Sequence, residues 1–251
     1  MSGHSKWSSI KHKKGAADAK RGKLFTKLAR SIIVAAKEGG GDPSGNSSLA
    51  NAIEKAKSYS MPKDNIDRAI AKGTGSSADS DNFETVTYEG YGPEGVAVVV
   101  EALTDNRNRT ASDVRHAFTR HGGSLGATGA VLWQFDRRGV VAVASAKVDE
   151  DELFTAAVDA GAEDIELDGS VFQVTSAPES LSAVRQAIEA AGFTVESAEL
   201  SLLPKTTVAI ETESAARTVM RLIDALEDND DVQEVYANFD IPEQVLEAVA
   251  S

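Results

Sequence analysis

Residues 139–202, GVVAVASAKVDEDELFTAAVDAGAEDIELDGSVFQVTSAPESLSAVRQAIEAAGFTVESAELSL, decide the fold of this 251-residue chain. Short runs that are rich in valine and isoleucine alternate with two longer runs that place apolar residues at helical spacing. The predicted elements are strands at 140–144, 164–167, 171–175 and 194–202, and helices at 152–160 and 178–191. This βαββαβ order is the split βαβ arrangement of a ferredoxin-like domain.

The segments before and after this module are predicted to form one domain together. The elements predicted before it are strands at 85–89 and 96–103, a helix capped by Thr110 or Ser112, a glycine-rich loop and a strand at 131–135. Those predicted after it are a strand at 206–210, a helix at 214–226 and a strand at 232–237. Neither segment has enough apolar residues to form its own core, so we expect the tail to pack with residues 83–135. The module is then an insertion.

The first 75 residues predict a small helical bundle, which the polar linker GSSADSDN separates from the rest. Apolar residues recur at helical spacing in three runs, 16–37, 49–57 and 64–72. Glycines 39–41 end the first helix, Ser47 or Ser48 caps the second, and Gly73 stops the third. The core of this bundle is thin, so docking onto the remainder and flexible tethering both stay open.

These patterns predict an α+β multidomain protein. With 251 residues, of which 41% are hydrophobic, the chain is large enough for two or three cores. The expected domains are a basic helical domain at 1–75, an α/β domain at 83–135 plus 204–251, and an inserted ferredoxin-like domain at 136–203.

Charge is divided unequally along the chain. Residues 1–74 hold 15 of the 26 Lys and Arg and 6 of the 39 Asp and Glu, a net charge of +9. The remaining 11 basic and 33 acidic residues give −22, and the whole chain carries −13. Such asymmetry is typical of a protein whose basic part binds a polyanion.

The basic part offers an arm, HSKWSSIKHKK at 4–14, and the basic side of the helix at 16–37. Cations clustered beside an aromatic residue favour binding to a phosphate backbone. Single lysines can equally be solvated, and the tryptophan can equally pin the arm to another domain. The candidate binding residues are Lys6, Trp7, Lys11, His12, Lys13, Lys14, Lys20, Arg21, Lys23, Lys27 and Arg30, of which Arg21 fits the basic stripe least well.

A further candidate contact is TDNRNRT at 104–110, where Arg107 and Arg109 lie in a predicted loop between strand and helix. An Asx-turn followed by a helix cap explains this composition without any ligand. Two arginines in one loop can also clamp a backbone phosphate.

No pattern of catalytic or metal-binding residues stands out. Cysteine is absent, no phosphate-binding G-x-x-x-x-G-K-[ST] occurs, and His116 and His121 are spaced five apart on a helix, a poor angle for a shared metal. The acidic runs at 149–152 and 227–231 are predicted to be solvated turns. We therefore expect no enzymatic activity, no metal, no cofactor and no small-molecule substrate.

The sequence also has no apolar stretch long enough to span a membrane, so no membrane partner is expected. The N-terminus lacks an apolar secretion signal, and its basic composition alternatively fits a mitochondrial transit peptide. That alternative leaves the charge division unexplained, so we expect a cytoplasmic protein.

Five stretches closely resemble the YebC/PmpR family of probable transcriptional regulatory proteins, and the similarity runs essentially from end to end. They are SGHSKWSSIKHKKGAADAKRGKLFTKLAR, MPKDNIDRAIAKGTG, YGPEGVAVVVEALTDNRNRTASDVRHAF, GGSLGATGAV and IDALEDNDDVQEVYANFDIP. The resemblance implies a helical N-terminal domain, two α/β domains with the ferredoxin-like one inserted, and a cytoplasmic, non-enzymatic role.

The resemblance leaves the bound polymer open. Bacterial members are described as DNA-binding regulators and are also linked to ribosomes, and a mitochondrial relative is a translational activator of cytochrome oxidase subunit I. The expected partner is therefore DNA or ribosomal RNA, the latter on the ribosome. No helix with evident base-reading side chains is predicted, and contacts to the backbone alone carry no sequence information.

Overall fold

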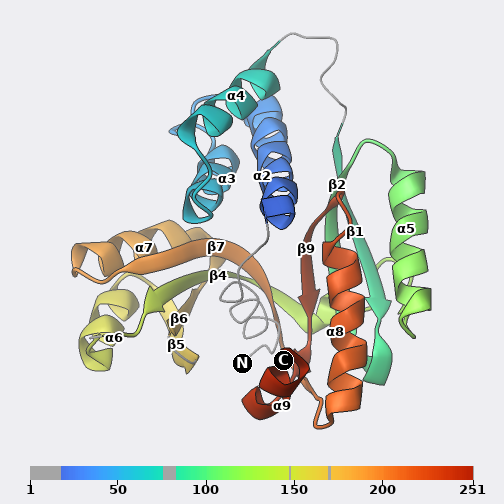
Figure 1. The fold of residues 1–251 in the computed structure, drawn as a ribbon. Helices are drawn as coiled ribbons and strands as arrows, with labels where there is room; N and C mark the ends of the chain where they lie inside the picture. Colours follow the sequence, from blue (N-terminus) through green and yellow to red (C-terminus); the bar gives the residue numbers. More distant parts are fainter. Residues whose placement is uncertain (1–17, 76–82, 147, 169–170, 251) are drawn as a thin grey trace.

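Apolar residues at helical spacing fold the N-terminal segment into a bundle of helices (Figure 1). The computed structural model describes residues 18–75, 83–146, 148–168 and 171–250 of the chain. The bundle helices are α2 (Asp18–Gly39), α3 (Ser47–Ser58) and α4 (Lys63–Thr74). Ile32, Leu49 and Ile66 are at most 5% exposed and belong to one core. The predicted helical N-terminal domain is thereby confirmed.

Two helix ends in this bundle differ from the prediction. Asn46 caps α3 in place of the predicted serines, and its Oδ1 accepts a hydrogen bond from the backbone N–H of Leu49 (3.1 Å). Gly73 does not stop α4 but lies in its last turn. A Cβ at Gly73 would lie 2.5 Å from the carbonyl oxygen of Ile33, so the close approach of α2 and α4 requires glycine there.

The second unit joins two segments that are far apart in the sequence. Its sheet has the order β3-β1-β2-β9, in which β9 from the tail pairs antiparallel with β2. Val100, Phe118 and Leu222 lie in the core between this sheet and helices α5 and α8. The elements are β1 (Glu84–Tyr91), β2 (Ala97–Thr104), α5 (Arg107–Arg120), β3 (Ser124–Leu125), β8 (Val208–Ala209), α8 (Glu213–Glu227), β9 (Val232–Ala237), β10 (Phe239–Asp240) and α9 (Glu243–Ala250), with 3-10 turns at Pro93–Gly95 and Leu132–Gln134.

Helix α5 begins earlier than the sequence pattern predicts. Asn106 caps it, because the Asn106 Oδ1 accepts a hydrogen bond from the backbone N–H of Arg109 (3.1 Å). Arg107 and Arg109 therefore lie in the first helical turn and not in a loop. The predicted caps Thr110 and Ser112 lie inside the helix.

The predicted strand at 131–135 is wrong, because a buried carboxylate takes up its hydrogen-bond donors. Glu89 is 3% exposed, and its carboxylate accepts backbone N–H bonds from Gly129, Val131 and Leu132 at 2.7–2.8 Å. Burial raises the pKa of Glu89, but these three bonds outweigh it and hold the pKa below its usual value. Residues 129–132 are thus held around one side chain instead of forming a strand, whereas Ser124–Leu125, earlier in the glycine-rich loop, pairs with β1 as β3.

The third unit has the predicted ferredoxin-like order. Its sheet runs β5-β6-β4-β7, with every neighbouring pair antiparallel. Helices α6 and α7 cover one face around Val141, Leu153 and Ile188, all 0% exposed. The elements are β4 (Phe135–Ala144), α6 (Glu150–Asp159), β5 (Ala162–Asp168), β6 (Val171–Ser176), a 3-10 turn at Pro178–Ser180, α7 (Leu181–Ala190) and β7 (Val195–Pro204).

The module is inserted through two adjacent strands. Its entry strand β4 pairs with its exit strand β7 from Phe135 opposite Pro204 onward, and the N–H of Lys205 donates to the carbonyl of Gln134 (2.8 Å). The chain thus leaves and re-enters the second unit at one place. We propose 1–75, 83–135 plus 204–251, and 136–203 as the domain boundaries.

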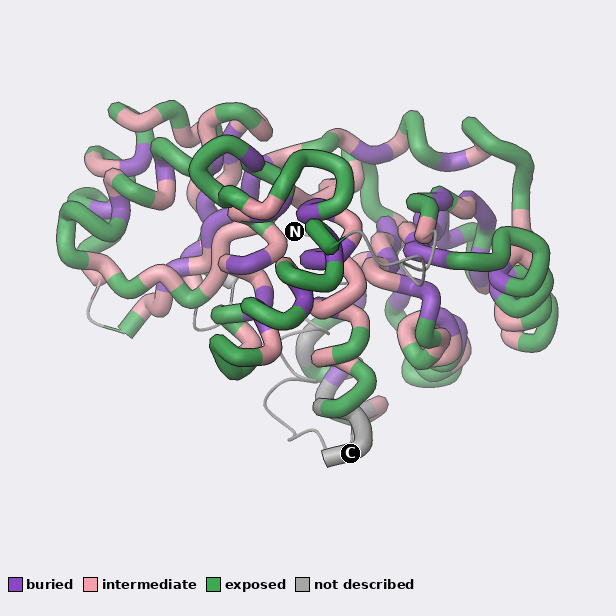
Figure 2. Tube along the Cα trace, turned by 90° about the horizontal axis from the view of Figure 1, so that it is seen from above, coloured by how far each residue is buried: buried purple, intermediate pink, exposed green. Residues whose placement is uncertain are grey.

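The helical unit is docked onto both other units. In Figure 1 it lies across the gap between them, with α3 above β7 and α2 beside β9. Buried stretches follow the inner faces of the units and exposed stretches follow their outer turns and helices (Figure 2). In the described ranges, no helix combines the length and the apolar character that crossing a membrane requires.

Candidate nucleic-acid interface

Helix α2 has one apolar side and one basic side, as its sequence predicts. Leu28, Ile32 and Ala36 are buried against α3 and α4. The opposite side carries Lys23, which is 53% exposed, together with Lys27 and Arg30. This basic side faces the acidic turn, which we define as residues 227–231 between α8 and β9.

Three basic side chains of α2 contact the acidic turn. Lys27 Nζ donates to the carbonyl oxygen of Glu227 (2.6 Å), and Arg30 donates to the carbonyl oxygen of Asp230 (2.8 Å). Lys23 lies 3.8 Å from the Asp230 carboxylate. The carbonyls of Glu227 and of the C-cap Asp228, which accepts from Lys23 (3.4 Å), end α8, where the helix dipole is negative and favours cations.

Asp231 is the centre of this contact. It is 5% exposed, and its Oδ1 accepts a bond from Arg30 (3.0 Å) while its Oδ2 accepts bonds from Arg109 (2.8 Å) and Thr110 (2.7 Å). Burial raises the pKa of Asp231, but the bonds from Arg109 and Thr110 outweigh it and lower the pKa below its usual value. One carboxylate therefore joins α2 to the start of α5.

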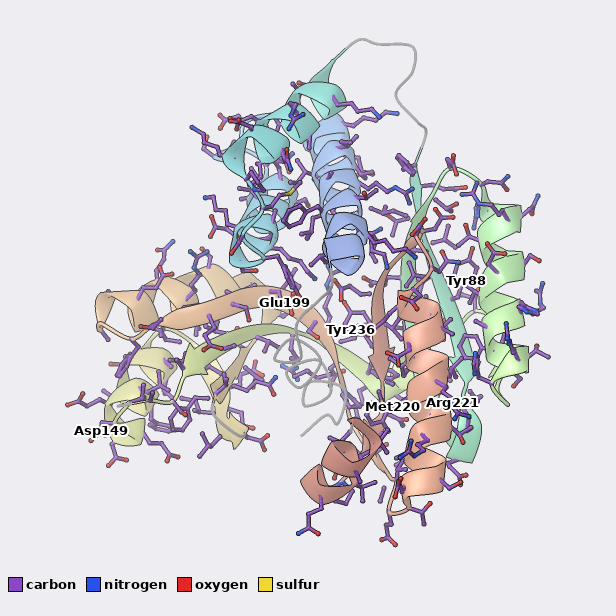
Figure 3. All side chains as sticks on the ribbon, in the orientation of Figure 1. Tyr88, Asp149, Glu199, Met220, Arg221 and Tyr236 are labelled. Atoms are coloured by element: carbon purple, nitrogen blue, oxygen red, sulfur yellow. The ribbon has the colours of Figure 1, made fainter. Side chains whose placement is uncertain are left out.

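A second, partly buried contact joins all three units. Lys55 on α3 forms ion pairs with Glu199 on β7 (3.0 Å) and with Glu234 on β9. Burial lowers the pKa of Lys55, but these carboxylates outweigh it and raise the pKa well above its usual value. Figure 3 shows Glu199 and Tyr236 beneath the helical unit. Arg185 on α7 adds a pair with Glu54 (2.8 Å).

The predicted binding residues differ in their solvent exposure, and some lie outside the described residues. Lys23 stays accessible to solvent, whereas Lys27 and Arg30 are partly buried in the contact between α2 and the acidic turn, which we call the dock. Burial lowers the pKa of Lys27 despite the carboxylates nearby. Arg107 is 64% exposed at 3.5 Å from Glu84. The arm residues Lys6, Trp7, Lys11, His12, Lys13 and Lys14 lie outside the described residues, as do the side chains of Lys20 and Arg21.

The structure thus brings Arg30 and Arg109 together on one acid, although the sequence placed them in separate candidate contacts. The sequence prediction that residues 227–231 form a solvated turn is wrong for Asp231. The sequence did contain a signal for this contact. A run of five acidic or amide residues begins at the end of the amphipathic helix α8, in a chain that also has a basic helix.

A groove beside the dock was also missed. It has a volume of about 530 Å³ between α2 and α4, and its lining includes Phe25, Arg68, Lys72 and Phe83. Arg30 closes one side, with its guanidinium carbon 5.1 Å from the centre of the Phe83 ring. The spacing of Arg68 and Lys72, one helical turn apart, is the sequence signal that marks a basic edge.

Among the described residues no group of three or more acidic or histidine side chains is placed to hold a metal ion.

Comparison with known proteins gives consistent matches over nearly the whole chain. Residues 5–76 match the TACO1/YebC protein N-terminal domain, and residues 83–239 match the TACO1/YebC second and third domain. A probable transcriptional regulatory protein of Rubrobacter xylanophilus is 60% identical over 250 residues, covering 100% of each chain. One of Geotalea uraniireducens is 57% identical over 247 residues, covering 98% of this chain and 99% of the other.

A solved structure is similar as well. The crystal structure of a conserved hypothetical protein from Aquifex aeolicus superposes with a TM-score of 0.81 at 50% sequence identity. The match covers 90% of this chain and 93% of that chain.

Proposed function

The chain belongs to the TACO1/YebC family, and on that premise we propose that it is a non-enzymatic, DNA-binding regulator of transcription. The name of its relatives, probable transcriptional regulatory protein, supports the regulatory part. Nucleic-acid binding is proposed from the uneven distribution of charge, because residues 1–74 have a net charge of +9 and the remainder of the chain has a net charge of −22. The proposed place of action is the cytoplasm, without metal, cofactor or small-molecule substrate.

The arm and the exposed start of the basic stripe form the proposed contact. The arm lysines 6, 11, 13 and 14, with Lys20, Arg21 and Lys23, neutralise backbone phosphates, and Trp7 stacks on a base. Lys27 and Arg30 hold the dock and reach phosphate only when it opens. A polyanion and the acidic turn therefore compete for the same cations, which links binding to docking.

A ribosome-associated translation factor that binds ribosomal RNA is the second candidate. The observation that favours it is the presence of both charge signs in large amounts, since RNA and basic proteins lie side by side on a ribosome. Contacts made by an arm to the phosphate backbone also carry little sequence information, which suits shape-based binding.

Crosslinking in cells separates the two candidates. We expect the full chain to crosslink to nucleic acid, and recovery of DNA fragments with no ribosomal cosedimentation on sucrose gradients supports the transcriptional role. Recovery of ribosomal RNA, with cosedimentation that nuclease abolishes, supports the translational role and overturns the transcriptional one. If neither polymer is recovered above an uncrosslinked control, nucleic-acid binding itself is refuted.

A further inference from the structure

The exposed side of α5 is a second basic surface. Helix α5 lies at the edge of the molecule opposite the inserted module (Figure 1). Its exposed residues recur every three or four positions and so follow one side of the helix. Beyond the exposed first turn at 107–109, they are Ser112, Asp113, Arg115, His116, Thr119 and Arg120. Asp113 is the single acid within the helix, so cations and hydroxyls predominate.

Arg221 on α8 extends this surface. Burial lowers the pKa of His121, and the charges of Arg120, Arg221 and His116 lower it further. Arg120, His116 and Arg221 are all exposed, and Figure 3 marks Arg221 on α8 at the level of the C-terminal end of α5. Arg120 from α5 and Arg221 from α8, which act on His121, are thus positive in a part of the chain that is acidic as a whole.

Three arginines of this surface form no ion pair with any residue that the structure describes. Arg109, Arg185 and Arg217 each hold a carboxylate within 3.0 Å. In contrast, no carboxylate of the described part of the chain lies within 4.0 Å of a guanidinium nitrogen of Arg115, Arg120 or Arg221. Residues 75–251 contain three times as many acidic as basic residues, 33 against 11, so unpaired arginines on one face indicate an anion from outside.

We infer that the outer side of α5, together with Arg221, is a second contact for the phosphate backbone of nucleic acid. The inference rests on the proposed function and deepens it by assigning a contact to the second domain. Arginine pairs with phosphate through two parallel N–H bonds, and serine and threonine hydroxyls also donate to phosphate oxygens. The 14 residues of α5 extend about 20 Å, which is long enough to contact several phosphates of a nucleic-acid backbone.

Position supports this assignment. Arg107, in the first turn of α5, is 64% exposed and continues the surface toward the dock. The Asp231 contact fixes that first turn against α2 through Arg109 and Arg30. While this contact is closed, the exposed Lys23 and the α5 surface belong to one docked assembly, so that a single polymer can touch both.

Charge removal tests this inference. The triple variant R115Q/R120Q/R221Q of the full chain is compared with wild type by fluorescence anisotropy on a short labelled DNA duplex and on a single-stranded RNA. We expect affinity at about 0.1 M salt to fall on the order of 100-fold, because each phosphate contact contributes about 0.9 to the slope of log affinity against log salt. The slope on duplex DNA should become shallower by about 2.7.

Two further variants make the result specific. R217Q removes an arginine of α8 that is already paired with Glu213, so affinity should stay within about twofold of wild type. R115K/R120K/R221K keeps the charge and should retain most of the salt slope. Equal affinity and slope for the glutamine triple variant and for wild type overturn the inference and leave the proposed function standing. Absence of binding by wild type overturns both.

Discussion

Replacement of Asp231 by alanine is expected to lower the free energy of unfolding by about 3 kcal/mol, because it removes a buried carboxylate that two guanidinium groups and one hydroxyl share. Arg30, Arg109 and Thr110 all bond this carboxylate, and they come from two different units. Hydrogen bonds from charged donors to a buried carboxylate contribute more than exposed ion pairs, and Asp231 accepts from two arginines at once. Urea unfolding of the full chain measures the loss.

Asp230→Ala is the matched control. The Asp230 carboxylate is 65% exposed and lies 3.8 Å from Lys23, so its loss should change the unfolding free energy by less than about 0.5 kcal/mol. Similar stabilities for the Asp231 and Asp230 variants would mean that Asp231 does not hold the dock together.

The Asp231 effect should also depend on pH in one direction. Because the pKa of Asp231 is below its ordinary value of 3.8 in the folded chain, its contribution is fully present above that value. The contribution is lost as pH falls through the folded pKa. The stability difference between wild type and Asp231→Ala should therefore be constant near neutral pH and shrink at acid pH.

Replacement of the four arm lysines by glutamine is expected to reduce nucleic-acid affinity by on the order of 1,000-fold at about 0.1 M salt. The variant is K6Q/K11Q/K13Q/K14Q, and its stability should match wild type because the arm has few apolar residues to bury. The reason for the loss is counterion release, since each neutralised phosphate frees condensed cations. Anisotropy with a labelled duplex measures it.

The control variant makes the same change of net charge elsewhere in the basic domain. K37Q/K57Q/K63Q/K72Q alters four exposed lysines and leaves the arm intact. We expect it to lose about tenfold at most. Equal losses in both variants would assign binding to the overall charge of the domain and not to the arm.

Much of the fold follows from local patterns. The ferredoxin-like order was predictable because each of its elements combines a clear period with glycine or proline at its ends, as at Gly161, Pro178 and Gly192. The strand at 232–237 was predicted with its observed bounds. Its pairing with β2 is a long-range contact that no local pattern specifies.

The missed elements have tertiary causes. Glu89 reaches across 40 residues to bind the N–H of Gly129, and this removes a strand that local propensity favours. The start of α5 depended on a choice among neighbouring cap residues, and Asn106 was the one used. Helix α9 was not predicted, although Leu246 is 0% exposed in the second core.

The sequence predicts which residue types form the candidate interface, but it does not predict which groups of the protein they contact. Charge counting identified a basic segment, and helical spacing separated Lys23, Lys27 and Arg30 from the apolar side of α2. What no pattern revealed is that part of this stripe is held by the protein's own acidic turn. Opposite charges 200 residues apart can pair with each other or with outside partners, and the structure distinguishes these cases.

The salt dependence of binding by the full chain tests the central claim most directly. Affinity for duplex DNA is measured by anisotropy from about 50 to 200 mM salt, the range over which counterion release dominates. If the arm and the exposed basic stripe bind the backbone, the slope of log affinity against log salt should be about −5 or steeper, and the four-lysine variant should lose about 3.6 of it. A wild-type slope shallower than about −1 would contradict nucleic-acid binding by the basic segment.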